Sequence, residues 1–382
     1  MTRSPIPHKG RGATINPQGR FETLRREPID DGWGRTLRSD HPPMDGQADL
    51  SDEDVAESME AARELPTQLF IDHARTIITR NVSPDIPFRQ SINPYRGCEH
   101  GCVYCYARPA HAYLDLSPGL DFETKLFYKP DAARLLEAEL RKPGYRPQWI
   151  ALGANTDPWQ PVERRLGITR GILEVLARFR HPVGIVTKGA VLIERDIDLL
   201  ADMARDDLVM VAISVTTLDP ALKRTLEPRA SAPATRLRVM RKLADAGVPV
   251  MVMFSPVIPF VNDAELERVL EAAYDAGARH AAYVMLRLPH EVKELFRAWL
   301  DVHLPLKAAH VMSLVTQMRG GKDYDSAFGT RMRGEGAYAD VIAQRFRTAC
   351  KRLGLNAQPM PVLSTAHFRV PPGAGDQIEL PL

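Results

Sequence analysis

The sequence predicts an α/β protein with six βα units in an open, partial barrel. Short apolar segments rich in Val, Ile, Leu and Met recur between residues 148 and 286. Segments with a helical spacing of apolar residues separate them, as Ile168, Ile172 and Leu176 show within residues 163–179. Near-continuous apolar strands that alternate with helices are typical of a parallel sheet covered by helices. Six units are fewer than the eight that close a full barrel, so we expect a TIM-like (β/α)6 barrel that stays open. A flat doubly wound sheet is the alternative.

Each element follows from this alternation. The first strand is expected at residues 91–93, and the other five strands at residues 148–152, 182–187, 208–215, 248–254 and 280–286. Helices are expected at residues 131–141, 163–179, 191–204, 234–246 and 263–276. The chemistry of such folds lies at the carboxyl ends of the strands, so the loops that follow the strands should carry the functional groups.

The chain divides into three parts. Residues 1–64 are rich in Gly, Pro, Arg and Asp, with a helix-like start only near residue 51, and predict a largely disordered or extended N-terminal arm. Residues 65–295 contain the βα series and predict the core barrel. Residues 296–382 predict a C-terminal extension that covers the barrel.

Composition restricts the class of protein. The chain has 382 residues, of which 44% are hydrophobic and 26% charged, with a net charge of +2. These values are typical of a soluble globular protein and neither require nor exclude a nucleic-acid partner. No apolar run reaches the roughly 18 residues of a membrane span, and the N-terminus lacks the apolar core of a secretory signal. We therefore expect a cytoplasmic protein without a membrane partner, whose oligomeric state the sequence leaves open.

Three of the four cysteines, Cys98, Cys102 and Cys105, fall within eight residues. Clustered cysteines in a cytoplasmic chain indicate metal binding or catalysis, because a reducing cytosol disfavours structural disulfides. Three thiolates on one loop can hold a soft metal centre and leave one coordination position open. The fourth, Cys350, lies in an amphipathic segment and is expected to be a buried small hydrophobe.

A structural zinc site is the alternative for these cysteines. It would have three Cys and one His, with His100 or His111 as the fourth ligand, and would indicate a binding module without catalysis. Structural zinc loops usually come in pairs, whereas this loop stands alone before a βα series. A catalytic metal centre is therefore favoured.

Polar groups follow successive predicted strands. Asn155 and Thr156 come after the strand at 148–152, and Lys188 comes directly after the strand at 182–187. Ser214 places a hydroxyl within an apolar strand, where it needs a hydrogen-bonding partner, and Arg229 stands in a Glu-Pro-Arg loop farther along. Solvation of Lys188 and a neighbouring carbonyl for Ser214 would explain each one alone. Their recurrence at strand ends indicates a shared binding site.

The spacing C-x3-C-x2-C, with Tyr104 before the last cysteine, resembles the signature of the radical S-adenosylmethionine (SAM) superfamily. The resemblance implies a [4Fe–4S] cluster held by Cys98, Cys102 and Cys105, with SAM chelating the fourth iron. It further implies reductive cleavage of SAM to a 5′-deoxyadenosyl radical and a one-electron reductant such as flavodoxin or ferredoxin. Tyr104 is implied to lie beside the adenine of SAM.

Within that superfamily, residues 88–335 resemble the DNA repair photolyase-like group, which is related to spore photoproduct lyase. The resemblance rests on Asn93-Pro-Tyr-Arg-Gly-Cys98, the tyrosines on each side of Cys105, Thr156-Asp-Pro, Thr187-Lys-Gly and Ile213-Ser-Val. It implies that Lys188 binds the carboxylate of SAM and Ser214 its ribose. Asn155, Thr156 and Arg229 are further candidate cofactor-binding residues because they lie in the loops after predicted strands. Nucleic acid is the first candidate substrate, and a peptide or a small molecule is the alternative.

The chain departs from the lyase at one functional position. The lyase has a hydrogen-donating cysteine in the loop that corresponds to residues 153–158, and this sequence has none there. Tyr106 remains as the candidate catalytic residue that relays a hydrogen atom, and reversal of thymine dimers is disfavoured. Basic glycine-rich segments at 319–322 and 328–336 are expected either to bind phosphates or to cover the open side of the barrel.

Overall fold

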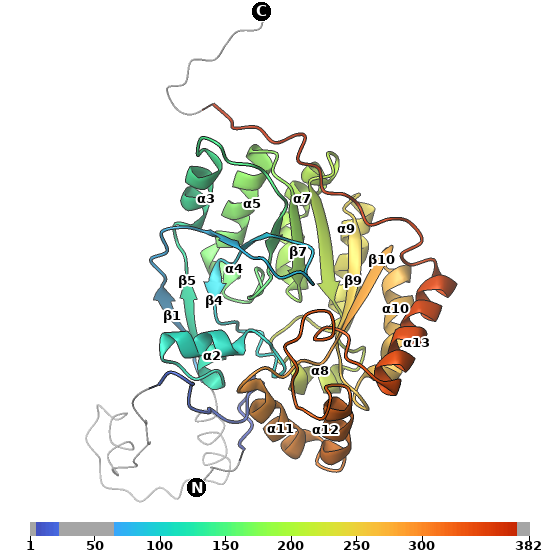
Figure 1. Ribbon diagram of the computed structural model, residues 1–382. Coiled ribbons are helices and arrows are strands. Elements are labelled where there is room, and N and C mark those ends of the chain that lie inside the picture. Colours follow the sequence, from blue (N-terminus) through green and yellow to red (C-terminus); the bar gives the residue numbers. More distant parts are fainter. Residues whose placement is uncertain (1–4, 23–64, 373–382) are drawn as a thin grey trace, which may run out of the picture.

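Six parallel strands form most of the main sheet (Figure 1). The computed structural model describes residues 5–22 and 65–372. The parallel strands are β3 (Gln90–Ile92), β6 (Ile150–Leu152), β7 (Val183–Thr187), β8 (Val209–Ser214), β9 (Val250–Val257) and β10 (His280–Met285). The strand order β10-β9-β8-β7-β6-β3-β2 places β10 at one edge and the antiparallel strand β2 (Ile78–Arg80) at the other. The sheet does not close among the described residues, which confirms the predicted open, partial α/β barrel.

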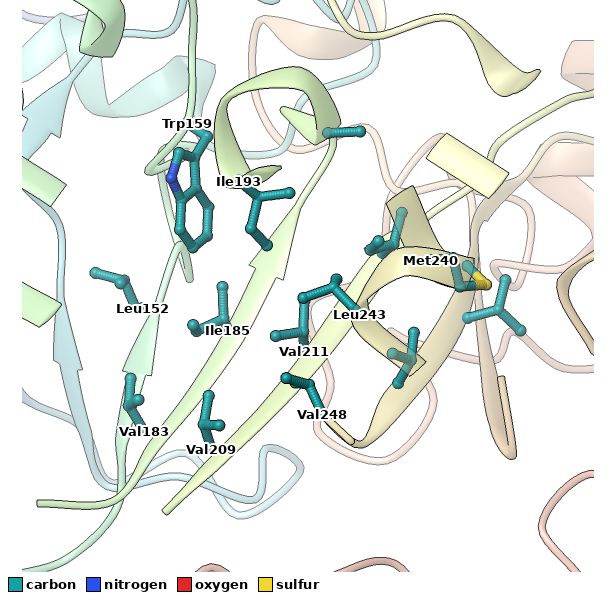
Figure 2. Close-up of a cluster of buried hydrophobic side chains, with 14 of the residues drawn as sticks. Leu152, Trp159, Val183, Ile185, Ile193, Val209, Val211, Met240, Leu243 and Val248 are labelled. Atoms are coloured by element: carbon teal, nitrogen blue, oxygen red, sulfur yellow. The ribbon is translucent and has the colours of Figure 1, made fainter. Parts of the chain in front are cut away.

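Amphipathic helices cover the outer face of this sheet. They are α3 (Ala132–Leu140), α5 (Ile168–Arg178), α7 (Ile197–Ala204), α9 (Pro233–Asp245) and α10 (Leu266–Asp275). Figure 2 shows Val183, Ile185, Val209 and Val211 of the strands and Leu243 of α9 within one cluster of buried apolar side chains. Burial of these apolar side chains is the main force that holds helices on sheet. In the described part of the chain, no helix has the length and apolarity that crossing a membrane requires.

Two of the predicted helices are interrupted. Residues 163–179 form α4 (Glu163–Leu166) and then α5, because Gly167 takes a left-handed conformation with φ of 63° between them. Residues 191–204 contain α6 (Ala190–Ile193), the short 3-10 helix η2 (Glu194–Asp196) and α7. The spacing of apolar residues predicts a single helix for each segment. A turn within an amphipathic segment hardly changes this spacing, so the interruption is not visible in the sequence.

A second, small sheet lies beside the cysteine loop. It consists of β1 (Gln68–Ile71), β5 (Lys125–Tyr128) and β4 (Tyr95–Arg96), in the order β1-β5-β4. The helix η1 (Arg108–Leu114) and the helix α2 (Leu120–Thr124) connect the cysteine loop to β5. Together they form a platform under the cysteine loop.

The N-terminal segment 5–22 has no helix or strand, yet part of it is buried against this platform. Ala13 is fully buried, and the backbone amides of Gly12 and Ala13 each donate to the carboxylate of Glu123 at 2.9 Å. Arg108 forms an ion pair with the same carboxylate. The predicted N-terminal arm thus includes residues that pack on the core, while its remaining parts, residues 1–4 and 23–64, lie outside the described residues.

Three helices follow the barrel: α11 (Val292–His303), α12 (Ala308–Gln317) and α13 (Ala337–Leu353). Within the barrel, α8 (Pro220–Leu226) precedes α9 and the 3-10 helix η3 (Asp263–Glu265) precedes α10. Residues of α11 and α12 share an apolar cluster with Val103 and Tyr104 of the cysteine loop. On the other side, α13 packs on α10 through the ion pair of Arg345 with Glu267, at 2.6 Å.

The chain then runs along the amino ends of the parallel strands (Figure 1). The amide of Ser364 donates to the carbonyl of Asp207, and the amide of Arg369 donates to the carbonyl of Phe179. The ring of Phe368 packs against Tyr145 and His181, with centroids 5.6 Å apart in both pairs. This segment therefore lies at the edge of the sheet opposite to the carboxyl ends, where the site residues gather.

Candidate functional site

A cavity of about 410 Å³ lies at the carboxyl ends of the strands. All three clustered cysteines line it, together with residues from the loops after β6, β7 and β10 and from the strands β7, β8, β9 and β10 themselves. Five of the other predicted site residues also line it: Tyr104, Tyr106, Asn155, Lys188 and Ser214. The fold therefore brings together groups that lie far apart in sequence.

The cysteine thiols are free and largely withdrawn from solvent. Cys98 and Cys102 are buried, Cys105 is partly exposed, and none of the three forms a disulfide. Burial raises the pKa of Cys98, and it raises the pKa of Cys102 to about 12. A buried thiol of this kind becomes a thiolate when a cation coordinates it. Three such thiols around one cavity fit the metal cluster that the sequence predicts.

The backbone of the cysteine loop is held by distant segments. The amide of Cys98 donates to the carbonyl of Phe122, and the amide of Val103 donates to the carbonyl of Leu226, both at 3.0 Å. Gly101 has a φ of 67°, and a Cβ there would lie 2.8 Å from a carboxylate oxygen of Glu123. Glycine at this position lets the loop pass close to the platform. The positions of the thiols thus depend on contacts outside the loop.

The two histidines of the zinc alternative have other partners. Nε2 of His111 lies 2.9 Å from the carbonyl of Lys125, and burial lowers the pKa of His111 to about 4. Nδ1 of His100 lies 3.4 Å from Asp157. Within residues 5–22 and 65–372, no three His, Cys, Asp or Glu side chains are arranged to hold a single metal ion.

Asp157 joins three loops around the cavity. Its carboxylate accepts hydrogen bonds from the hydroxyl of Thr187 at 2.7 Å and from the amide of Lys188 at 2.6 Å, and it lies beside His100. Burial alone would raise the pKa of Asp157, but His100 and these donors lower it to about 2. The residue is therefore an anion that fixes the loop after β7 against the loop after β6.

The neighbouring pair Asn155 and Thr156 is held by Asn93. The side-chain oxygen of Asn93 accepts from the amide of Asn155 at 3.0 Å and from the amide of Thr156 at 3.4 Å. The hydroxyl of Thr156 donates to the carbonyl of Tyr95 and is buried, so only Asn155 of this pair lines the cavity. Thr156 acts on the cavity through the backbone of its loop.

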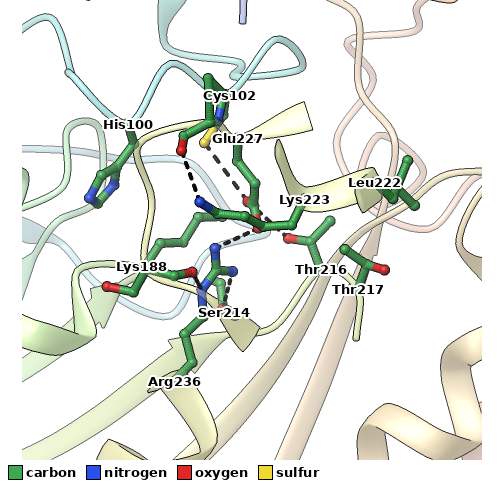
Figure 3. Close-up of polar contacts among 12 residues, drawn as sticks. His100, Cys102, Lys188, Ser214, Thr216, Thr217, Leu222, Lys223, Glu227 and Arg236 are labelled. Atoms are coloured by element: carbon green, nitrogen blue, oxygen red, sulfur yellow. Dashed lines mark hydrogen bonds and ion pairs between the residues drawn. The ribbon is translucent and has the colours of Figure 1, made fainter. Parts of the chain in front are cut away.

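Lys188 and Ser214 lie near a buried charge pair (Figure 3). Nζ of Lys188 lies 5.8 Å from the centroid of the Tyr104 ring, at the wall of the cavity. Ser214 ends β8, and its carbonyl accepts from the guanidinium of Arg236 at 2.9 Å. The sequence predicted both positions from the strand pattern. It gave no sign that Arg236, one helix farther on, supports them.

The hydroxyl of Tyr104 is anchored behind the cavity wall. It donates to the carboxylate of Glu227 and lies 3.2 Å from the hydroxyl of Thr216. Burial alone would raise the pKa of Glu227, but the charges of Arg236 and Lys188 and the bond from Tyr104 hold it below its usual range. The Tyr104 ring is thus oriented by a buried anion, with a face left to line the cavity.

Arg229 does not line this cavity. Its guanidinium lies 3.3 Å from Glu99, and its amide donates to the carbonyl of His100. It borders a second, larger cavity of about 1030 Å³ on the outer side of the cysteine loop. The sequence indicated Arg229 as a cofactor-binding residue, whereas the structure places it at this second cavity and not at the cavity of the thiols.

Two further arginines line the cavity, and one of them, Arg331, belongs to the basic glycine-rich segment 328–336. The guanidinium of Arg287 lies 5.1 Å from the centroid of the Tyr106 ring, whose hydroxyl donates to the carbonyl of Ala154. Arg331 binds the carboxylate of Asp85, with Nε 2.6 Å from the nearer oxygen. Burial raises the pKa of Tyr106 to about 12. Arg287 lies two residues after the end of β10, a strand-end position that could have revealed it.

Comparison with known proteins agrees with this arrangement. Residues 92–273 match the radical SAM superfamily. An uncharacterized protein of Mycobacterium tuberculosis is 40% identical over 217 residues, which cover 56% of this chain and 64% of the relative. An uncharacterized protein of Methanocaldococcus jannaschii is 26% identical over 174 residues, 46% of this chain and 62% of the relative. The chain thus spans less than two thirds of the length of these relatives.

The fold is shared with a solved enzyme. Spore photoproduct lyase complexed with dinucleoside spore photoproduct superposes with a TM-score of 0.53 at 14% identity, covering 81% of this chain and 85% of the lyase. A mutant of the same lyase gives the same TM-score at 13% identity. These structures share the arrangement of strands and helices. They show that this chain has the fold of the lyase, and residues 92–273 are similar in sequence to the radical SAM superfamily.

Proposed function

We propose that this protein is a radical SAM enzyme that binds a [4Fe–4S] cluster through Cys98, Cys102 and Cys105. The observation that carries the proposal is the single cavity lined by these three free thiols together with Lys188 and Ser214. When bound, the cluster would supply one electron for the cleavage of SAM to methionine and a 5′-deoxyadenosyl radical. The protein's own side chains bind and orient SAM.

Four residues have proposed roles around SAM. Lys188 is a basic residue in the wall of the cavity and would bind the carboxylate of SAM as a point charge. Ser214, at the end of β8, would hydrogen-bond the ribose, and Asn155 offers an amide to the same cavity. The ring of Tyr104 offers an apolar face for adenine, with its hydroxyl held by Glu227.

The substrate that we propose first is nucleic acid. Arg287 and Arg331 line the cavity in addition to Lys188, and Asp157 is a lining carboxylate whose oxygens already accept hydrogen bonds. An excess of cations at the cavity favours an anionic substrate such as a phosphodiester. The lyase with the shared fold has been solved with a dinucleoside photoproduct, which supports the same class.

Tyr106 is the proposed relay for a hydrogen atom. It lines the cavity beside Arg287, and the loop from Gly153 to Pro158 contains no cysteine. Cys350, the one cysteine outside the cluster motif, lies in α13 and does not line the cavity. We therefore propose a net reaction other than thymine-dimer reversal.

Anaerobic purification tests the cluster. The wild-type protein should be brown and contain about four irons per chain, and Cys98→Ala should lose both. Cys350→Ala is the matched control and should keep the iron. Stoichiometric zinc in place of iron would exclude the proposal. The loaded protein, once reduced, should convert SAM to 5′-deoxyadenosine.

Substrate identity needs a separate experiment. The loaded, reduced protein is incubated with deuterated oligonucleotides, and 5′-deoxyadenosine is examined for deuterium by mass spectrometry. Label in 5′-deoxyadenosine supports nucleic acid as the substrate. If deuterium appears in 5′-deoxyadenosine only when a deuterated peptide or small molecule is supplied, the substrate is not nucleic acid.

A further inference from the structure

The larger cavity, next to Arg229, forms a basic groove on the outer side of the cysteine loop. Five basic residues line it: Lys9, Arg11, Arg164, Arg165 and Arg229. Among the described residues, the lining contains only one carboxylate, that of Glu99. Glu99 is already engaged, since it accepts from Thr67 at 2.6 Å and lies 3.3 Å from Arg229. The groove therefore presents a net positive charge.

Arg11 is buried in the wall of the groove, where its guanidinium donates to the carbonyls of Glu123 and Leu65. Burial and the nearby charge of Arg229 lower the pKa of Arg11. Arg164 and Arg165 follow Glu163 in α4, and both are exposed at the rim without an ion pair to any described residue. Charges placed in this way are available to a partner.

The groove and the cavity of the thiols share one lining residue. His100 lines both cavities, and it lies on the cysteine loop between Cys98 and Cys102. A substrate attacked by a radical would have to enter the cavity of Lys188 and Ser214. A donor of electrons needs only to come near the cluster, because an electron can cross a thin protein wall whereas a substrate cannot.

We propose that the basic groove is the docking site of a small acidic one-electron carrier protein of the flavodoxin type. The inference rests on the proposed function, because it needs a cluster on the three cysteines. In the step, one electron passes from the reduced centre of the carrier to the cluster; the carrier is oxidised by one electron, and no bond forms or breaks. Charge complementarity over a small, polar contact is typical of such short-lived redox encounters.

A charge reversal at the rim tests the groove. The double variant Arg164→Glu with Arg165→Glu is compared with Arg347→Glu with Lys351→Glu, two exposed positions on α13. Binding of oxidised flavodoxin to the cluster-loaded protein is measured by calorimetry at several salt concentrations. The rim variant should bind about tenfold more weakly or worse and lose its salt dependence. The α13 control should match the wild type.

Cluster reduction is the second measurement. The rate with reduced flavodoxin should fall in the rim variant by a similar factor, while the rate with dithionite should stay unchanged. Equal binding and equal reduction by flavodoxin in both variants would overturn the inference, as would a rim variant that loses oligonucleotide binding but keeps its response to flavodoxin. A protein that never loads a cluster would instead refute the proposed function, and the inference with it.

Discussion

The guanidinium of Arg236 lies 2.6 Å from the carboxylate of Glu227, and both side chains are completely buried. The same carboxylate accepts from Tyr104, whose ring lines the cavity, and Arg236 also donates to the carbonyl of Ser214. One buried ion pair therefore supports two residues with proposed roles in binding SAM. This pair connects the stability of the fold with the geometry of the site.

Removing one partner of this pair should be strongly destabilising. Arg236→Met leaves the charge of Glu227 buried without its cation, which we expect to lower the free energy of unfolding by about 3–5 kcal/mol. Urea unfolding of the variant and of the wild type measures the difference. Arg238→Met on the same helix breaks an exposed pair with Glu194 and should cost less than about 1 kcal/mol. Equal losses in the two variants would contradict the assigned role of the buried pair.

Lys188 should contribute to SAM affinity through its charge. Lys188→Met keeps the length of the side chain but removes the ammonium, and we expect SAM binding to weaken about tenfold or more, as the loss of a charge-assisted hydrogen bond would. Equilibrium dialysis with the cluster-loaded protein measures the affinity. Lys242→Met, an exposed lysine paired with Glu194, should leave the affinity unchanged. If the Lys188→Met variant keeps the affinity for SAM, another cation must bind the SAM carboxylate.

His181 should make the stability depend on pH. Burial lowers the pKa of His181 to about 4, below the ordinary value of 6.5, so the unfolded chain takes up the proton more readily than the folded one. Its stabilising contribution is therefore complete above pH 6.5 and is lost as the pH falls toward 4, by about 3 kcal/mol.

His181→Gln tests this dependence, because a neutral amide can keep a hydrogen bond to Tyr145. The decline in the free energy of unfolding between pH 6.5 and 4 should become shallower by about 3 kcal/mol in this variant. His367→Gln, at an exposed position, should show the wild-type decline. Identical pH profiles for wild type and His181→Gln would contradict the prediction.

The segment along the amino ends of the strands should stabilise the fold through Phe368. Its ring packs on Tyr145 and His181 while remaining partly exposed, so we expect Phe368→Ala to cost about 1–3 kcal/mol. The melting temperature reports this loss. Val362→Ala in the same segment changes a side chain that is 85% exposed and should cost less than about 0.5 kcal/mol. A smaller loss at Phe368 than at Val362 would show that the segment is not held by its aromatic contact.

The strands of the barrel could be predicted because they are buried on both faces. Continuous apolar runs such as residues 208–215 leave few other interpretations, and β8 lies within that run. The small sheet could not be found in this way, since β1 is mostly exposed and β4 has two residues. Neither strand is long enough to show an alternation of apolar and polar residues.

The sequence predicts those parts of the candidate site that depend on residues close together in the chain. The spacing of the cysteines and the positions of Lys188 and Ser214 after their strands are visible in the sequence. The residues that hold the cavity wall in place cannot be read from the sequence. Glu227 binds Tyr104 across 123 residues, and Arg331 binds Asp85 across 246 residues. Such pairings depend on how the βα units fold together, which no local pattern records.

The hydrogen bonds of the cysteine loop have a consequence for the order of events during folding. The amide of Cys98 binds Phe122, that of Val103 binds Leu226, and that of Glu99 binds the side chain of Gln160 at 2.8 Å. A peptide of residues 96–108 lacks all three partners, so the spacing of its thiols is undetermined. Closing contacts between such distant segments costs chain entropy and comes late for that reason. The three thiols therefore reach their final positions only after most of the barrel has been synthesised and folded.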